Sequence, residues 1–161
     1  MRLKEIKDEC FQDYKKSSML LSTITCDWKC CIEGNFSKSI CQNNSLYKLP
    51  TKQYSEEEVY NRYISNPITE AVIIGGLEPF LQFEEIYKLI KYFRNNNCFD
   101  EFIIYTGCTE IEIEEEITIL AKNLTNIIVK FGRYIPDKEP KYNEILGIFL
   151  SSNNQYAKRI S

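Results

Sequence analysis

Residues 18–30 read SMLLSTITCDWKC, an apolar run typical of a buried strand that leads directly into the pair Cys26 and Cys30. Cys41 follows in the chain, so the three cysteines form a C-x3-C-x10-C array. Residues 71–79 (AVIIGGLEP) show a related pattern, because a second apolar run ends in two glycines, a leucine and an acid. Three thiolates can hold an iron–sulfur cluster with one iron left open, and a glycine pair lets the backbone come close to a polar small molecule.

Short apolar runs alternate with helical patterns along the chain. The expected strands are residues 18–25, 71–74, 101–105, 126–131 and 145–150. The expected helices begin after the N-cap Ser55, at Phe83 and after the cap Thr109. Repeated strand–helix units predict right-handed βαβ connections. We therefore expect a single α/β domain over residues 1–161, a parallel-sheet partial (β/α) barrel of about five strands.

One residue with a possible role stands at or just beyond the end of each expected strand. These residues are Cys26, Gly75, Thr106, Gly132 and Ser151. Functional residues of parallel sheets gather at the carboxyl ends of the strands, so we expect the five to share one rim. The longest irregular region runs from Cys31 to Lys52, and its position beside the cysteines indicates a cluster-binding loop over about residues 26–52.

Composition limits the possible functions. A net charge of -3 gives no general footprint for nucleic acid or membrane, no apolar segment is long enough to span a bilayer, and the mixed charges of residues 1–8 do not suit a secretory signal. The expected location is the cytoplasm. Seven cysteines, an odd number, then favour metal ligation over a disulfide framework. The absence of histidine excludes histidine-ligated zinc and the Ser-His and Cys-His pairs.

The order of these motifs resembles that of small radical S-adenosylmethionine enzymes, and most closely that of the activating proteins of anaerobic ribonucleotide reductases. The resemblance runs from about Leu20 to the C-terminus. Its elements are residues 26–30 (CDWKC), 41–43 (CQN), 75–79 (GGLEP), 104–107 (IYTG), 129–135 (VKFGRYI) and 151–155 (SSNNQ). Each element alone is a weak signal, and together in this order they are specific.

The chain also departs from the pattern of that family. Glu33 occupies the third cysteine position of the usual C-x3-C-x2-C array, so a longer loop must bring in another ligand. Leu77 adds a residue between the second glycine and the acid of the turn. Residues 130–131 (KF) replace an aspartate of the activating proteins, and their Asp-Gly-Pro-Gly segment is not found near residues 12–14.

The resemblance implies a [4Fe-4S] cluster bound by Cys26, Cys30 and Cys41, with Cys31 as the rival third ligand. It also implies that S-adenosyl-L-methionine binds at the open iron and is cleaved reductively to methionine and a 5′-deoxyadenosyl radical. The implied contacts are Gly75, Gly76 and Glu78 at the methionine amino group, Trp28 and Ile40 against the adenine or the cluster, Tyr105 and Thr106 near the ribose, and Lys130, Arg133, Ser151 and Asn154 at the carboxylate and the rim.

The function implied by the resemblance is that of an anaerobic radical oxidoreductase that activates a glycyl-radical enzyme. Its implied partners are a class III ribonucleotide reductase and an electron donor of the flavodoxin or ferredoxin type. At 161 residues the chain leaves little for a substrate lid, which favours a macromolecular partner over the open face of the sheet.

Other readings of the same residues remain open. One is a non-catalytic zinc or iron–sulfur module for binding or electron transfer, built from Cys26, Cys30, Cys31 and Cys41. The other is a radical enzyme that acts on a peptide or small molecule. Four residues also have purely structural alternatives: a tight turn for Gly75 and Gly76, and ordinary rim charges for Lys130 and Arg133. Packing alone would explain Trp28.

Overall fold

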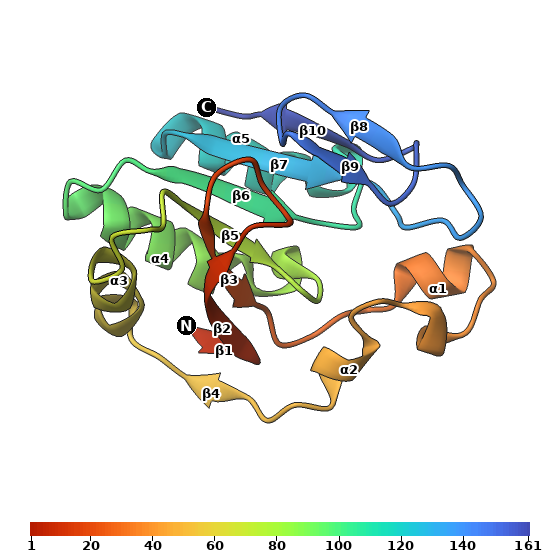
Figure 1. The fold of residues 1–161 in the computed structure, drawn as a ribbon, viewed down its shortest axis with the longest axis horizontal. Helices are drawn as coiled ribbons and strands as arrows, with labels where there is room; N and C mark the ends of the chain where they lie inside the picture. The colour runs from red at the N-terminus through yellow and green to blue at the C-terminus, as the bar shows by residue number, and fades with distance from the viewer.

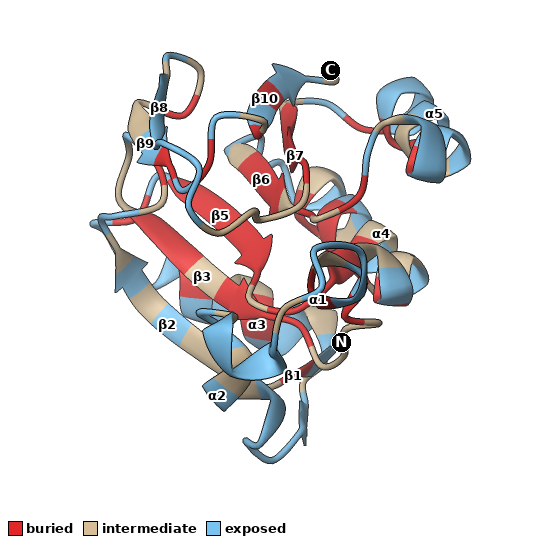
Figure 2. Ribbon diagram, turned by 90° about the vertical axis from the view of Figure 1, so that its right-hand side faces the viewer, coloured by how far each residue is buried: buried red, intermediate tan, exposed pale blue.

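Four parallel strands form the centre of a six-stranded sheet in the computed structural model, which describes residues 1–161 (Figure 1). They are β3 (Ser18–Ser22), β5 (Ala71–Gly75), β6 (Glu101–Tyr105) and β7 (Ile127–Phe131). The edge strands β2 (Glu5–Cys10) and β10 (Tyr156–Arg159) pair antiparallel, which gives the order β10-β7-β6-β5-β3-β2. Every residue of β5 and β7 is buried, as Figure 2 shows in red, which explains their largely apolar sequence, with Lys130 of β7 as the exception.

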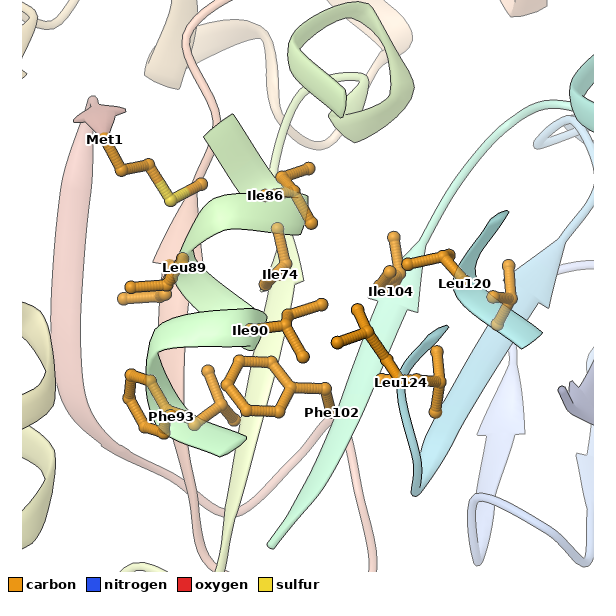
Figure 3. Packing of buried hydrophobic residues seen from close by; sticks show 14 of the residues in the cluster. Met1, Ile74, Ile86, Leu89, Ile90, Phe93, Phe102, Ile104, Leu120 and Leu124 are labelled. Atoms are coloured by element: carbon orange, nitrogen blue, oxygen red, sulfur yellow. The ribbon is translucent and has the colours of Figure 1, made fainter. Parts of the chain in front are cut away.

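Three helices cover one face of this sheet. They are α3 (Glu56–Ile64), α4 (Phe83–Asn95) and α5 (Glu114–Asn123). Figure 3 shows α4 directing Leu89, Ile90 and Phe93 toward the strands, with Phe102 of β6 against Phe93. These two rings meet edge to face with their centroids 5.0 Å apart. The expected apolar stripe from Phe83 onward is confirmed as the face that α4 buries in the core.

A hairpin contributes to the cover of the opposite face of the sheet. It consists of β8 (Lys141–Asn143) and β9 (Ile148–Leu150). Leu146 and Leu150 of this region pack with Tyr14 against Ile73 and Ile103. The hairpin shields this side of the central strands.

The cysteine region is the long segment of chain between β3 and β4 (Lys52–Gln53). It contains α1 (Lys29–Glu33), η1 (Lys38–Ile40) and α2 (Asn44–Tyr47). It ends at β4, which pairs with β1 (Arg2–Leu3). The helix α1 lies beyond the carboxyl ends of the central strands (Figures 1 and 2). This position places the cysteines at the edge of the sheet where the sequence predicts a site.

Two expectations about secondary structure are wrong. Residues 145–150 do not join the parallel sheet, because Gly147, at φ +73°, donates to Asn143 and closes the local β8–β9 hairpin. Thr109 does not cap α5, which begins at Glu114 after η3 (Ile111–Ile113). The Thr109 amide and hydroxyl both donate to the Glu112 carboxylate instead, at 2.8 and 3.1 Å.

Ser55 is confirmed as an N-cap. Its hydroxyl accepts a hydrogen bond from the Glu58 amide at 3.1 Å, and the Glu58 carboxylate accepts one from the Ser55 amide at 2.6 Å. This capping box satisfies two groups that would otherwise lack partners at the start of α3. The closure of the sheet toward a partial barrel stays a prediction. None of the helices combines the length and the apolar character that a membrane crossing requires.

Candidate metal and cofactor site

A cavity of about 640 Å³ opens at the carboxyl ends of the central strands. Its lining includes all five strand-end residues that the sequence predicts to share a rim, namely Cys26, Gly75, Thr106, Gly132 and Ser151. The parallel direction of β3, β5, β6 and β7 explains four of these positions, because it brings the carboxyl ends of these strands to the same edge, whereas Ser151 follows β9 of the hairpin. All five residues line one cavity, although Ser151 does not end a parallel strand as the sequence predicts.

Four cysteines line this cavity, and none of them forms a disulfide: Cys26, Cys30, Cys31 and Cys41. Trp28, at φ 62°, turns the chain between the first two thiols, and its amide donates to Cys26 Sγ at 3.3 Å. Cys30 Sγ lies against Gly107, where an added Cβ would be only 3.0 Å from the sulfur. The absence of a side chain at Gly107 therefore leaves room for this thiol.

The four thiols line the same cavity. No three cysteine, aspartate or glutamate side chains are gathered closely enough to hold a single metal ion. A zinc ion needs its donors in a tetrahedron around one atom. In a four-iron cluster each cysteine binds a different iron, so the sulfurs enclose a volume. Thiolates are soft ligands that suit both zinc and iron–sulfur clusters, so the donor set is compatible with either.

Burial disfavours the thiolate forms of Cys26 and Cys30 when no metal is bound. It raises the pKa of Cys26 to about 12, and it also raises the pKa of Cys30. Metal ligation needs the thiolate, so ligation by either residue releases a proton. Cluster assembly at these positions is thus favoured at higher pH.

Glu78 joins the ends of two strands at the wall of the cavity. Its Oε1 accepts hydrogen bonds from the Thr106 hydroxyl at 2.7 Å and the Phe80 amide at 3.2 Å. Its Oε2 accepts one from the Gly107 amide at 3.0 Å. Burial raises the pKa of Glu78, and these three hydrogen bonds oppose the rise. Because a carboxylate oxygen has two lone pairs, Oε2 retains one acceptor site for a ligand.

The glycine turn lets the cysteine region approach β5. Gly76 has φ +82°, and an added Cβ there would lie 3.0 Å from Leu46 of α2 and 3.1 Å from the Cβ of Ser22. Leu77 is buried in the cavity lining and its successor Glu78 donates its amide to Thr25. The extra residue of the turn is therefore accommodated without moving the acid away from the cavity.

Lys130 is a buried cation in the same lining. Only 7% of the residue is exposed, and its ammonium donates to the Gly132 carbonyl at 3.2 Å without a carboxylate at salt-bridge distance. Burial lowers the pKa of Lys130 to about 8. An ammonium has three donors, so the group keeps capacity for an anionic ligand. Lys130 is not an ordinary rim charge.

Four of the residues predicted to contact a cofactor are absent from the cavity lining: Trp28, Ile40, Arg133 and Asn154. Trp28 is buried, and its ring meets Tyr47 edge-on at 5.5 Å between centroids. Ile40 is exposed on η1, and the Asn154 amide donates to the Arg133 carbonyl at 2.8 Å. Their contacts with a ligand stay predictions. The other seven line the cavity: Gly75, Gly76, Glu78, Tyr105, Thr106, Lys130 and Ser151.

The structure adds lining residues that the sequence does not indicate. Asp13 enters from the β2–β3 loop, where its carbonyl accepts a hydrogen bond from the Tyr105 hydroxyl. Phe149 enters from the hairpin and is 70% exposed. Neither belongs to a motif, and the hairpin itself was not expected. No local pattern in the sequence would have identified them.

Comparison with known families agrees with this chemistry. No curated protein and no solved structure matches the chain. A family model described as a 4Fe-4S single cluster domain matches residues 14–157. The match includes the four cavity cysteines, the glycine turn and all strands of the sheet except β2 and the end of β10. The chain therefore belongs to the family of 4Fe-4S single cluster domains.

Proposed function

We propose that this protein is a radical S-adenosylmethionine enzyme whose [4Fe-4S] cluster is held by Cys26, Cys30 and Cys41. The observation that carries the proposal is the single cavity shared by these cysteines and the glycine-acid turn, residues 75–79. A binding or electron-transfer module would need the thiols alone. The turn and a buried cation beside them favour a second, small polar ligand next to the cluster.

The charges of the cavity suit the amino acid end of S-adenosylmethionine. The free acceptor site on Glu78 Oε2 would bind the ammonium group, and the Lys130 ammonium would bind the carboxylate. Both side chains are buried, so each interaction forms where water competes weakly. When bound, the reduced cluster supplies the electron that cleaves the sulfonium to methionine and a 5′-deoxyadenosyl radical. The protein contributes orientation of the substrate and protection from water.

We expect reductive cleavage of S-adenosylmethionine by the anaerobically reconstituted protein. With a strong reductant, 5′-deoxyadenosine and methionine should form in equal amounts, as measured by liquid chromatography and mass spectrometry. Omission of either the reductant or the iron should abolish both products. Formation of S-adenosylhomocysteine would indicate a methyltransferase instead. An intact cluster with no product would favour the binding or electron-transfer module.

We further propose that the radical activates a glycyl-radical enzyme, such as a class III ribonucleotide reductase. Support comes from the resemblance of residues 104–107 and 151–155 to the reductase activators. The exposed Phe149 beside the cavity and the exposed Ile32 on α1 would suit a protein that covers the site. An electron donor of the flavodoxin or ferredoxin type would reduce the cluster.

A glycyl radical should appear on the partner when the reduced, S-adenosylmethionine-loaded protein is mixed with a class III reductase from the same source. Hydrogen abstraction from a backbone glycine gives a doublet in the electron paramagnetic resonance spectrum. A reductase whose radical glycine is replaced by alanine is the control and should show no doublet. An unchanged reductase, together with turnover on a short peptide or small molecule, would assign the radical to that other substrate class.

A further inference from the structure

Arg133 connects three separate parts of the chain beside the cysteine region. Its Nε and Nη2 donate to the two carboxylate oxygens of Glu33, at 3.1 and 3.2 Å. The Nη2 group also donates to Glu112 at 2.6 Å, and Nη1 donates to the Gly107 carbonyl. Glu33 is the last residue of α1, Glu112 lies in η3 and Gly107 follows β6. One guanidinium therefore holds α1 against the end of the sheet.

This arrangement differs from an isolated surface ion pair. The Arg133 side chain is only 12% exposed, and its contact with Glu33 is bidentate. Bidentate pairs within a network are the exception to the small contribution of surface salt bridges. Lys29 extends the network, because its ammonium lies 3.5 Å from both Glu112 and Asp27. Lys29, the first residue of α1, is thus linked to Glu112 directly, and Glu33, the last residue, is linked to it through Arg133.

The helix α1 depends on such contacts. It has only five residues, and Trp28 at its N-cap makes no side-chain capping hydrogen bond. A helix this short is not stable by itself. Cys30 lies on α1, and its sulfur faces Gly107, whose carbonyl Arg133 binds. Arg133 consequently fixes both the helix that carries this thiol and the surface next to the thiol.

We infer that Arg133 and Glu33 are positioning residues for Cys30, which hold α1 in place so that the thiol faces the cavity. The inference rests on the proposed function only in treating Cys30 as a cluster ligand. The ion pair, rather than a metal bond, determines the position of the C-terminal end of α1. The protein should therefore lose iron from the cluster more readily when this ion pair is broken, even though neither residue binds iron.

The test compares Glu33→Gln and Arg133→Lys with a matched control, Asp8→Asn. Asp8 forms a bidentate pair with Arg62, at 2.5 and 2.8 Å, that links β2 to α3 away from the cysteines. In the reconstituted protein, the first two variants should lose iron to a chelator roughly five-fold faster than the wild type, the size expected for loss of about one strong ion pair. Asp8→Asn should lose iron at the wild-type rate. Equal rates for all variants, or equally fast loss in Asp8→Asn, would overturn the inference.

A second measurement uses metal-free protein and does not depend on the cluster. Alkylation of Cys30 by iodoacetamide, followed by peptide mass spectrometry, should be several-fold faster in Glu33→Gln than in the wild type. Cys98, which is buried against the core far from α1 in the chain, should react at an unchanged rate. Unchanged Cys30 labelling would contradict the positioning role. If the wild type binds no cluster, the proposed function fails while this labelling experiment still decides the inference.

Discussion

Cys41→Ala is expected to abolish binding of the four-iron cluster, whereas Cys31→Ala is expected to keep it. Cys30 and Cys31 are consecutive on α1, so their side chains point about 100° apart around the helix axis. The two side chains therefore cannot both point directly at one cluster. Cys41 follows η1 in an extended conformation, which leaves its side chain free of that restriction. Iron and sulfide analysis after anaerobic reconstitution, with the broad visible absorption of the cluster, measures the outcome.

Loss of the cluster in Cys41→Ala should be nearly complete, because only two protein ligands would remain to hold it. Cys26→Ala and Cys30→Ala should behave like Cys41→Ala. Cys98→Ala is the matched control, since this thiol is buried in the core and does not line the cavity. Loss of the absorption in Cys31→Ala with retention in Cys41→Ala would exchange the two assignments. A colourless protein with stoichiometric zinc would contradict the radical mechanism as a whole.

Gly76→Val is expected to lower the rate of 5′-deoxyadenosine formation roughly a hundred-fold, which corresponds to about 3 kcal/mol. Gly76 has φ +82°, and a non-glycine residue in that region costs roughly 1–2 kcal/mol. A β-branched side chain must also displace Leu46 and Ser22, which would lie about 3 Å from its Cβ. Both neighbours line the cavity, so the displacement changes the site directly. Product formation under saturating reductant measures the rate.

Two further variants separate this local effect from general destabilisation. Gly76→Ala carries the same backbone restriction with a smaller side chain and should lose less activity than Gly76→Val. Lys88→Ala changes an exposed position on α4 that does not line the cavity, and should retain the wild-type rate. Iron content must be measured for each variant. A wild-type rate in Gly76→Val with a full cluster would show that the turn does not contact the substrate.

The central part of the fold could be predicted because its signals are local. Residues 71–74 and 101–105 are short apolar runs, and each is buried in a parallel strand as expected. The edge strands could not be predicted in the same way. β2, with the sequence EIKDEC, has four charged residues among its six and no apolar run, and only its pairing with β3 makes it a strand. The hairpin β8–β9 replaced the expected fifth parallel strand because a local turn at Gly147 competes with the sheet.

The sequence by itself determined the chemistry that meets at the rim: thiols after β3, glycines after β5 and a threonine after β6. Spacing along the chain and the common direction of parallel strands are sufficient for that. Only the tertiary structure decided how the charged residues act. Glu33, which replaces an expected cysteine, has its partner 100 residues away in Arg133. The apolar neighbours of Lys130 predict its burial, but only the packing of other strands and loops around it decides that no carboxylate lies at salt-bridge distance from its ammonium.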